Sequence, residues 1–156
     1  MSKSFNLGKI ETLWVLGLLS TDELPNLAAE ALAHGLRSKS LVELAGCSPT
    51  ESEDIRRLFN QSLREITGKR RMLKTDALRE YAKQIATSIL TSEVSPLEGA
   101  RLIWRATLKA GVQGFHELDG FIYAASELED RPQDKELFEK AITEEAKRWS
   151  ERDCLD

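Results

Sequence analysis

The sequence of 156 residues has few cysteines and histidines, the residue types that most often ligate transition metals. It contains two cysteines and two histidines, and it has no CxxC pair, glycine-rich phosphate loop, Ser/His/Asp signature or HExxH motif. Two cysteines cannot form a disulfide framework, so a reducing cytoplasm is the compartment that we expect. We therefore predict no bound metal, no cofactor and no enzymatic activity.

Long hydrophobic runs are also missing. The only segment that imitates the core of a signal peptide is LWVLGLL, residues 13–19. It is preceded by Glu11 and followed by Thr21, Asp22 and Glu23, and no A-x-A cleavage site accompanies it. We expect neither a secretory signal nor a membrane span.

Period-two alternation, which is typical of β-strands, is absent as well, and apolar residues instead recur at helical spacing. The pattern predicts an all-α fold: a single helical domain over residues 1–156, built as a bundle of about seven helices. An S-P-x-E helix-start signal occurs at Ser48 and again at Ser95. Because the residues after the two signals match poorly, common capping chemistry explains them better than the alternative, a helical solenoid.

The second signal opens the segment that we predict to be the central helix, near residues 96–110. Ser95 fits an N-cap, Pro96 the first helical position and Glu98 the capping box. The segment is apolar almost all round, and its other charges form one basic stripe: Arg101, Arg105 and Lys109. A helix of this kind is usually buried on several sides. The stripe then needs counter-charges, for which we favour Glu127, Glu129 or C-terminal acids over a bound ligand.

Acidic residues dominate the end of the chain. The formal net charge is −4, and residues 115–156 alone contain 13 acidic and 6 basic residues. A predicted helix over residues 115–128 places His116, acids and one tyrosine on a polar face. A tyrosine among acids is typical of a surface that binds a basic protein partner. The predicted partner-binding residues are Asp119, Tyr123, Glu127, Glu129 and Asp130.

Two other interpretations of this face remain open. It is either a solvated surface whose Tyr123 is half covered by a neighbouring helix, or an enzyme site that uses His116, Asp119 and Glu127. A second acid–histidine pair, Glu30 and His34, could share a metal, but it offers too few ligands. We interpret His34 instead as a residue that complements the end of its helix, just before Gly35.

The basic segment 69–74 supports an alternative function, a regulator that binds nucleic acid through Lys69, Arg70, Arg71 and Lys74. Residues 41–58 could be taken for a helix-turn-helix. They lack the residue spacing expected around the turn, and Glu51, Glu53 and Asp54 would repel phosphate. We therefore rank nucleic-acid binding below an exposed basic connector.

Two stretches resemble small bacterial helical proteins of unassigned function. One is ALAHGLRSKSLVELAG, residues 31–46, continuing to Leu58 and Phe59; the other combines SPLEGAR, residues 95–101, with ASELED, residues 125–130. The resemblance implies an acidic cytoplasmic protein with no catalytic residues or cofactor, of a type that is often antitoxin-like or an immunity protein. The resemblance favours a non-enzymatic protein-interaction module, such as one that binds a toxin, over an enzyme. It gives no oligomeric state.

Overall fold

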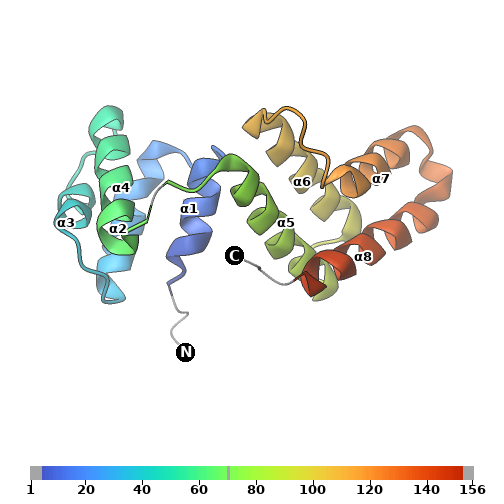
Figure 1. Ribbon diagram of the computed structural model, residues 1–156, viewed down its shortest axis with the longest axis horizontal. Coiled ribbons are helices and arrows are strands. Elements are labelled where there is room, and N and C mark those ends of the chain that lie inside the picture. Colours follow the sequence, from blue (N-terminus) through green and yellow to red (C-terminus); the bar gives the residue numbers. More distant parts are fainter. Residues whose placement is uncertain (1–4, 70, 153–156) are drawn as a thin grey trace. The chain divides into compact units, whose positions relative to one another are not determined.

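The computed structural model describes residues 5–69 and 71–152, and every regular element in these residues is a helix. The all-α prediction is confirmed. The chain divides into two compact units, Met1–Leu73 and Lys74–Asp156, called here the N-terminal and C-terminal units (Figure 1). The prediction of one domain over residues 1–156 stays a prediction. Two residues that the sequence drew attention to, Arg70 and Cys154, lie outside the described residues.

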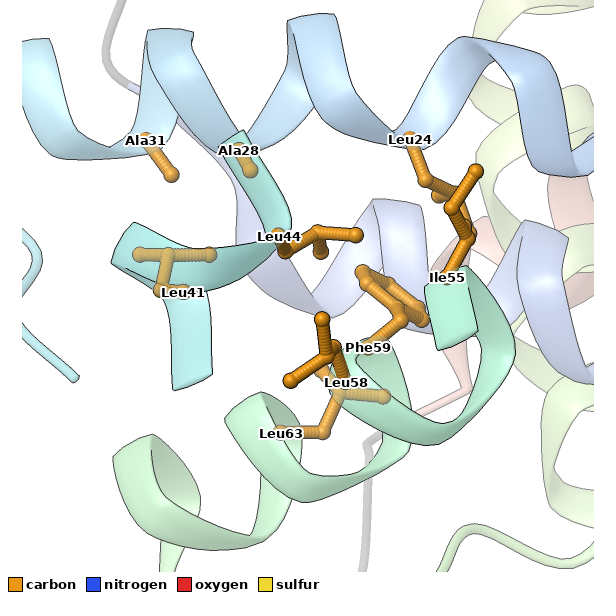
Figure 2. Packing of buried hydrophobic residues seen from close by; sticks show 9 residues of the cluster. All are labelled: Leu24, Ala28, Ala31, Leu41, Leu44, Ile55, Leu58, Phe59 and Leu63. Atoms are coloured by element: carbon orange, nitrogen blue, oxygen red, sulfur yellow. The ribbon is translucent and has the colours of Figure 1, made fainter. Parts of the chain in front are cut away.

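The N-terminal unit contains four α-helices and one 3₁₀ turn. They are α1 (Leu7–Val15), η1 (Thr21–Glu23), α2 (Leu24–Ala33), α3 (Lys39–Ala45) and α4 (Ser52–Thr67). Side chains of α2, α3 and α4 point toward one another and form the buried core in Figure 2, which comprises Leu24, Ala28, Ala31, Leu41, Leu44, Ile55, Leu58, Phe59 and Leu63. Helix α1 joins this core through partly buried residues that include Ile10 and Trp14.

Local capping explains where several of these helices begin and end. The side chain of Ser38 accepts the Leu41 amide at the start of α3, and Gly68 ends α4 with a φ of 65°. The S-P-x-E signal at Ser48 does not start a helix directly. Its glutamate, Glu51, accepts the Ser48 amide at 3.1 Å across a turn, and α4 begins only at Ser52. The signal predicts Pro49 as the first helical residue, which is three residues too early.

The C-terminal unit contains α5 (Lys74–Leu90), α6 (Pro96–Ala110), α7 (Asp119–Asp130), the 3₁₀ turn η2 (Pro132–Asp134) and α8 (Lys135–Glu151). The second start signal works as predicted, since Ser95 Oγ accepts the Glu98 amide at 3.2 Å. Helix α6 packs against α5, α7 and α8. It is the predicted central helix of this unit, although α8 also contacts the other three.

Three details of the predicted packing are wrong. Leu108 of α6 is 70% exposed, although the sequence predicts a helix that is apolar almost all round and buried on several sides. Leu137 of α8 is 63% exposed, although the apolar spacing of the last helix predicts that Leu137 and Ala141 face inward. Ala141 of α8 is exposed as well. Each helix is covered by its neighbours on one side only, so apolar residues on the other side stay in water. The helix predicted from residue 115 begins at Asp119, which leaves His116 in the preceding loop.

Helices α5 and α6 approach each other closely at Gly99, which is buried. A Cβ atom at this position would lie 2.5 Å from Cδ1 and 2.6 Å from Cγ1 of Ile89, and 3.2 Å from Ile85 Cγ2. Ile89 is itself only 5% exposed, so its side chain has little room to move away. The packing of α5 on α6 therefore requires glycine here.

We expect Gly99→Ala to lower the free energy of unfolding, measured by urea denaturation. Overpacking costs about 1–3 kcal/mol, whereas replacing a helical glycine by alanine returns about 1 kcal/mol. The matched control is Gly120→Ala in α7, whose new Cβ would meet the carboxylate of Glu145 at 2.8 Å. That carboxylate ends a flexible side chain and can shift together with its ion-pair partner, the exposed Arg148, so we expect a smaller loss than at Gly99. Equal stability of the two variants would contradict the close approach at Gly99.

Candidate functional site on helix α7

The loop that leads into α7 is held by a carboxylate between two arginines. Glu117 Oε2 lies 2.7 Å from Nη2 of Arg79 on α5, and Glu117 Oε1 lies 3.6 Å from Nη1 of Arg152, just after α8. The Arg79 guanidinium also lies over the ring of Phe115, 5.6 Å from its centroid. Hydrogen bonding from Arg79 is the main reason that the pKa of Glu117 lies below its ordinary value. These contacts fix the position at which α7 begins.

Helix α7 buries one face and exposes the other. Its inner face packs through Phe121, Ala124, Ala125 and Leu128. On the outer face, Tyr123 is 62% exposed, so it is not half covered by a neighbouring helix as the solvated-face interpretation required. Asp119, one turn before it, is also exposed, and its Oδ2 lies 3.2 Å from Nδ1 of His116. Tyr123 is thus an accessible aromatic residue with an acid at its side.

The acidic end of α7 is partly neutralised by the protein itself. Glu127 pairs with Arg131 at 3.0 Å, and Glu129 pairs with Arg101 of α6 at 3.7 Å. Acids at a helix C-terminus are unfavourable with the helix dipole, and these two arginines offset that cost. Asp130 is exposed and has no ion pair among the described residues.

The basic stripe of α6 behaves as predicted at one position of three. Arg101 finds its counter-charge in Glu129, one of the acids expected to supply it. Arg105 is exposed, and its charge opposes the rise that burial causes in the pKa of Tyr81. Lys109 is exposed, and neither it nor Arg105 has an ion pair in the part of the chain that the structure describes. Solvent therefore hydrates the charges of Arg105 and Lys109. Only Arg101 is neutralised by an acid among the described residues.

The basic segment 69–74 crosses the boundary between the N-terminal and C-terminal units. Lys74 Nζ donates to the Ala110 carbonyl at 3.2 Å, where a cation complements the C-terminus of α6. Lys69 and Arg71 belong to the other unit and are exposed. His34, the histidine considered for a metal or helix-end role, is exposed at the end of α2, and its ring stacks on that of Phe5 with the centroids 5.9 Å apart.

Comparison with known proteins identifies no relative: no protein-family model, curated protein or solved structure matches the chain. The resemblance to small bacterial helical proteins is therefore supported only as far as the small all-α fold. Among the described residues, no helix is both long enough and apolar enough to cross a bilayer. Residues 119, 123, 127, 129 and 130 stay a predicted binding surface.

The Glu117 ion pairs give a pH-dependent prediction. The folded pKa lies below the ordinary value of 4.5, so the ionised carboxylate stabilises the fold above that value. The stabilisation is lost as the pH falls through the lowered folded pKa. Since the pair is partly exposed, we expect Glu117→Gln to lower the free energy of unfolding at pH 7 by up to about 1 kcal/mol. The difference from wild type should vanish in acid.

Urea denaturation at neutral and acidic pH measures this difference. The control is Glu144→Gln on α8, an exposed glutamate without an ion pair among the described residues. It should leave stability unchanged at both pH values. A Glu117→Gln effect that persisted unchanged in acid would contradict the role of the carboxylate charge.

Proposed function

We propose that this chain is a non-enzymatic protein-binding module that binds a basic surface of a partner protein through the outer face of α7. The observation that carries the proposal is the exposure of Tyr123 on a helix that contains four acids and no lysine or arginine. Tyrosine is one of the residue types enriched among those that contribute most to binding at protein interfaces.

The roles of the individual residues follow from their surroundings. Tyr123 is the anchor, because its ring offers a large apolar area and its hydroxyl a hydrogen bond. Asp119 and Asp130 form the charged rim, because neither is paired with a lysine or arginine among the described residues. Glu127 and Glu129 already have arginine partners, so they contribute by exchanging those partners or by completing the rim. Rim charges act mainly on the rate of association, which salt then slows.

The resemblance suggests a more specific version of the proposal, in which the partner is a toxin that this cytoplasmic protein neutralises. Nucleic-acid binding through residues 69–74 is the alternative function. It has less support, because Lys74 is engaged with the Ala110 carbonyl. An enzyme that uses His116, Asp119 and Glu127 has less support too, because the carboxylate of Glu127 is already paired with Arg131 at 3.0 Å.

A photo-crosslinking amino acid at position 123, incorporated in the native host, is the first step of the test. We expect it to capture a defined basic protein, which the same reagent at the exposed position 42 of α3 does not capture. With that partner purified, Tyr123→Ala should weaken binding by on the order of tenfold or more, since interface anchors contribute about 2 kcal/mol or more. The double variant Asp119→Lys/Asp130→Lys should slow association and remove its salt dependence.

Two controls separate this face from general surface effects. Val42→Ala changes a residue that is 58% exposed, close to the 62% of Tyr123, and should bind as wild type does. Glu30→Lys on α2 reverses an exposed acid of the other unit and should leave the association rate little changed. Unaltered affinity of the Tyr123→Ala and charge-reversal variants would contradict the proposed role of the α7 face.

A further inference from the structure

The N-terminal unit contains a small pocket between α1, the last turns of α4 and the connector that follows α4. Its volume is about 140 Å³. The lining combines apolar, polar and cationic side chains: Trp14, Val15, Leu63, Asn60, Thr67, Glu11, Arg64, Lys69 and Arg71. A cavity of about 150 Å³ holds one benzene ring. The pocket therefore has room for one flat ring or a group of similar size.

The aromatic wall of the pocket is held in place by two contacts. The indole Nε1 of Trp14 donates to Asn60 Oδ1 at 3.1 Å, which fixes the direction of the side chain. The ring also meets Phe59 edge to face, with the centroids 5.3 Å apart and the planes at 77°. Phe59 is buried in the core of the unit (Figure 2). A ring that enters the pocket thus meets a preorganised indole.

The connector is also anchored, and this places two cations at the pocket. The carboxylate of Glu11, half-buried on α1, accepts the Met72 amide. Thr12 Oγ1, on the same helix, lies 3.8 Å from Met72 Sδ. Burial raises the pKa of Glu11, while the charge of Lys69 and the Met72 amide oppose the rise. Lys69 and Arg71 both come shortly before Met72 in the chain, and they line the pocket together with Arg64.

The pocket carries more positive charge than its own acid neutralises. Its lining holds three cations and one carboxylate. Arg64 and Arg71 have no ion pair among the described residues, and the charge of Lys69 acts on Glu11. A guanidinium binds carboxylates and phosphates through two parallel hydrogen bonds. An apolar wall next to unpaired guanidinium groups matches a ligand that joins a ring to an anion.

We propose that this pocket binds a small organic anion, a carboxylate or phosphate monoester that carries one flat ring. The ring packs against Trp14, and the anionic group accepts hydrogen bonds from Arg64 and Arg71. Glu11 holds the connector in position and limits the net positive charge. This site lies in the N-terminal unit and is independent of the α7 face.

Amide NMR of the isotope-labelled full chain tests the proposal with benzoate and phenyl phosphate as probes. The indole N–H signal of Trp14, identified by its loss in Trp14→Phe, should shift in a saturable manner with at least one of them. The more strongly bound probe tells whether the site prefers a carboxylate or a phosphate. Benzyl alcohol, which has the ring without the charge, and inorganic phosphate, which has the charge without the ring, should both bind more weakly.

Variants assign the roles. Arg64→Gln and Arg71→Gln should each weaken binding by on the order of tenfold, as expected for the loss of a hydrogen bond to a charged group. Glu11→Gln keeps an acceptor for the Met72 amide and removes a negative charge, so binding should become several-fold tighter. The matched control Arg57→Gln lies two turns before Arg64 on α4, where Arg57 pairs with Asp54, and should bind as wild type does.

Three results would overturn the proposal. The first is the absence of any shift at the Trp14 indole up to the solubility limit of both probes. The second is equal affinity of wild type, Arg64→Gln and Arg71→Gln, provided that their amide spectra show folded protein. The third is equal binding of benzyl alcohol and the more strongly bound of the two anionic probes, since the charge would then contribute nothing.

Discussion

Every helix of this protein depends on burying one apolar face, because helices of 7 to 17 residues gain too little from their own hydrogen bonds to be stable in water. The buried faces of α2, α3 and α4 meet in one unit, and those of α5, α6, α7 and α8 meet in the other. This requirement decides which side of each helix remains outside. Tyr123 is exposed because Phe121, Ala124 and Leu128 occupy the inner side of α7.

The packing of the helices decides which charged side chains come close enough to form ion pairs. Glu117 joins Arg79 and Arg152, and Glu129 joins Arg101, so segments distant in the sequence are linked at their surfaces. Partly exposed pairs of this kind add little stability each. Their larger consequence is to define which charges remain for a partner. Among the described residues, the acids of α7 without a lysine or arginine partner are at its two ends. In the N-terminal unit, three cations and one carboxylate line the pocket.

The α7 face and the pocket differ in how much of each could be predicted from the sequence. The α7 face could be predicted because its acids and tyrosine lie on one short helix, where spacing alone puts them side by side. The pocket could not, because Trp14, Arg64 and Arg71 come from three segments. The basic run 69–74 was the available signal, but its meaning depends on contacts with distant segments: Asn60 holds the Trp14 indole, and Glu11 accepts the Met72 amide of the connector.

The sequence by itself determined the helical class, the capped start of α6 at Ser95, the glycine stops at Gly68 and Gly111, and the acidic character of α7. All of these depend on residues within about one turn of each other. Only the tertiary structure decided that Leu108 faces water, that Arg101 pairs with Glu129, and that α5 touches α6 at Gly99. Such features depend on the rotation and register of one helix against another, which the summed packing of many side chains sets and no local pattern encodes.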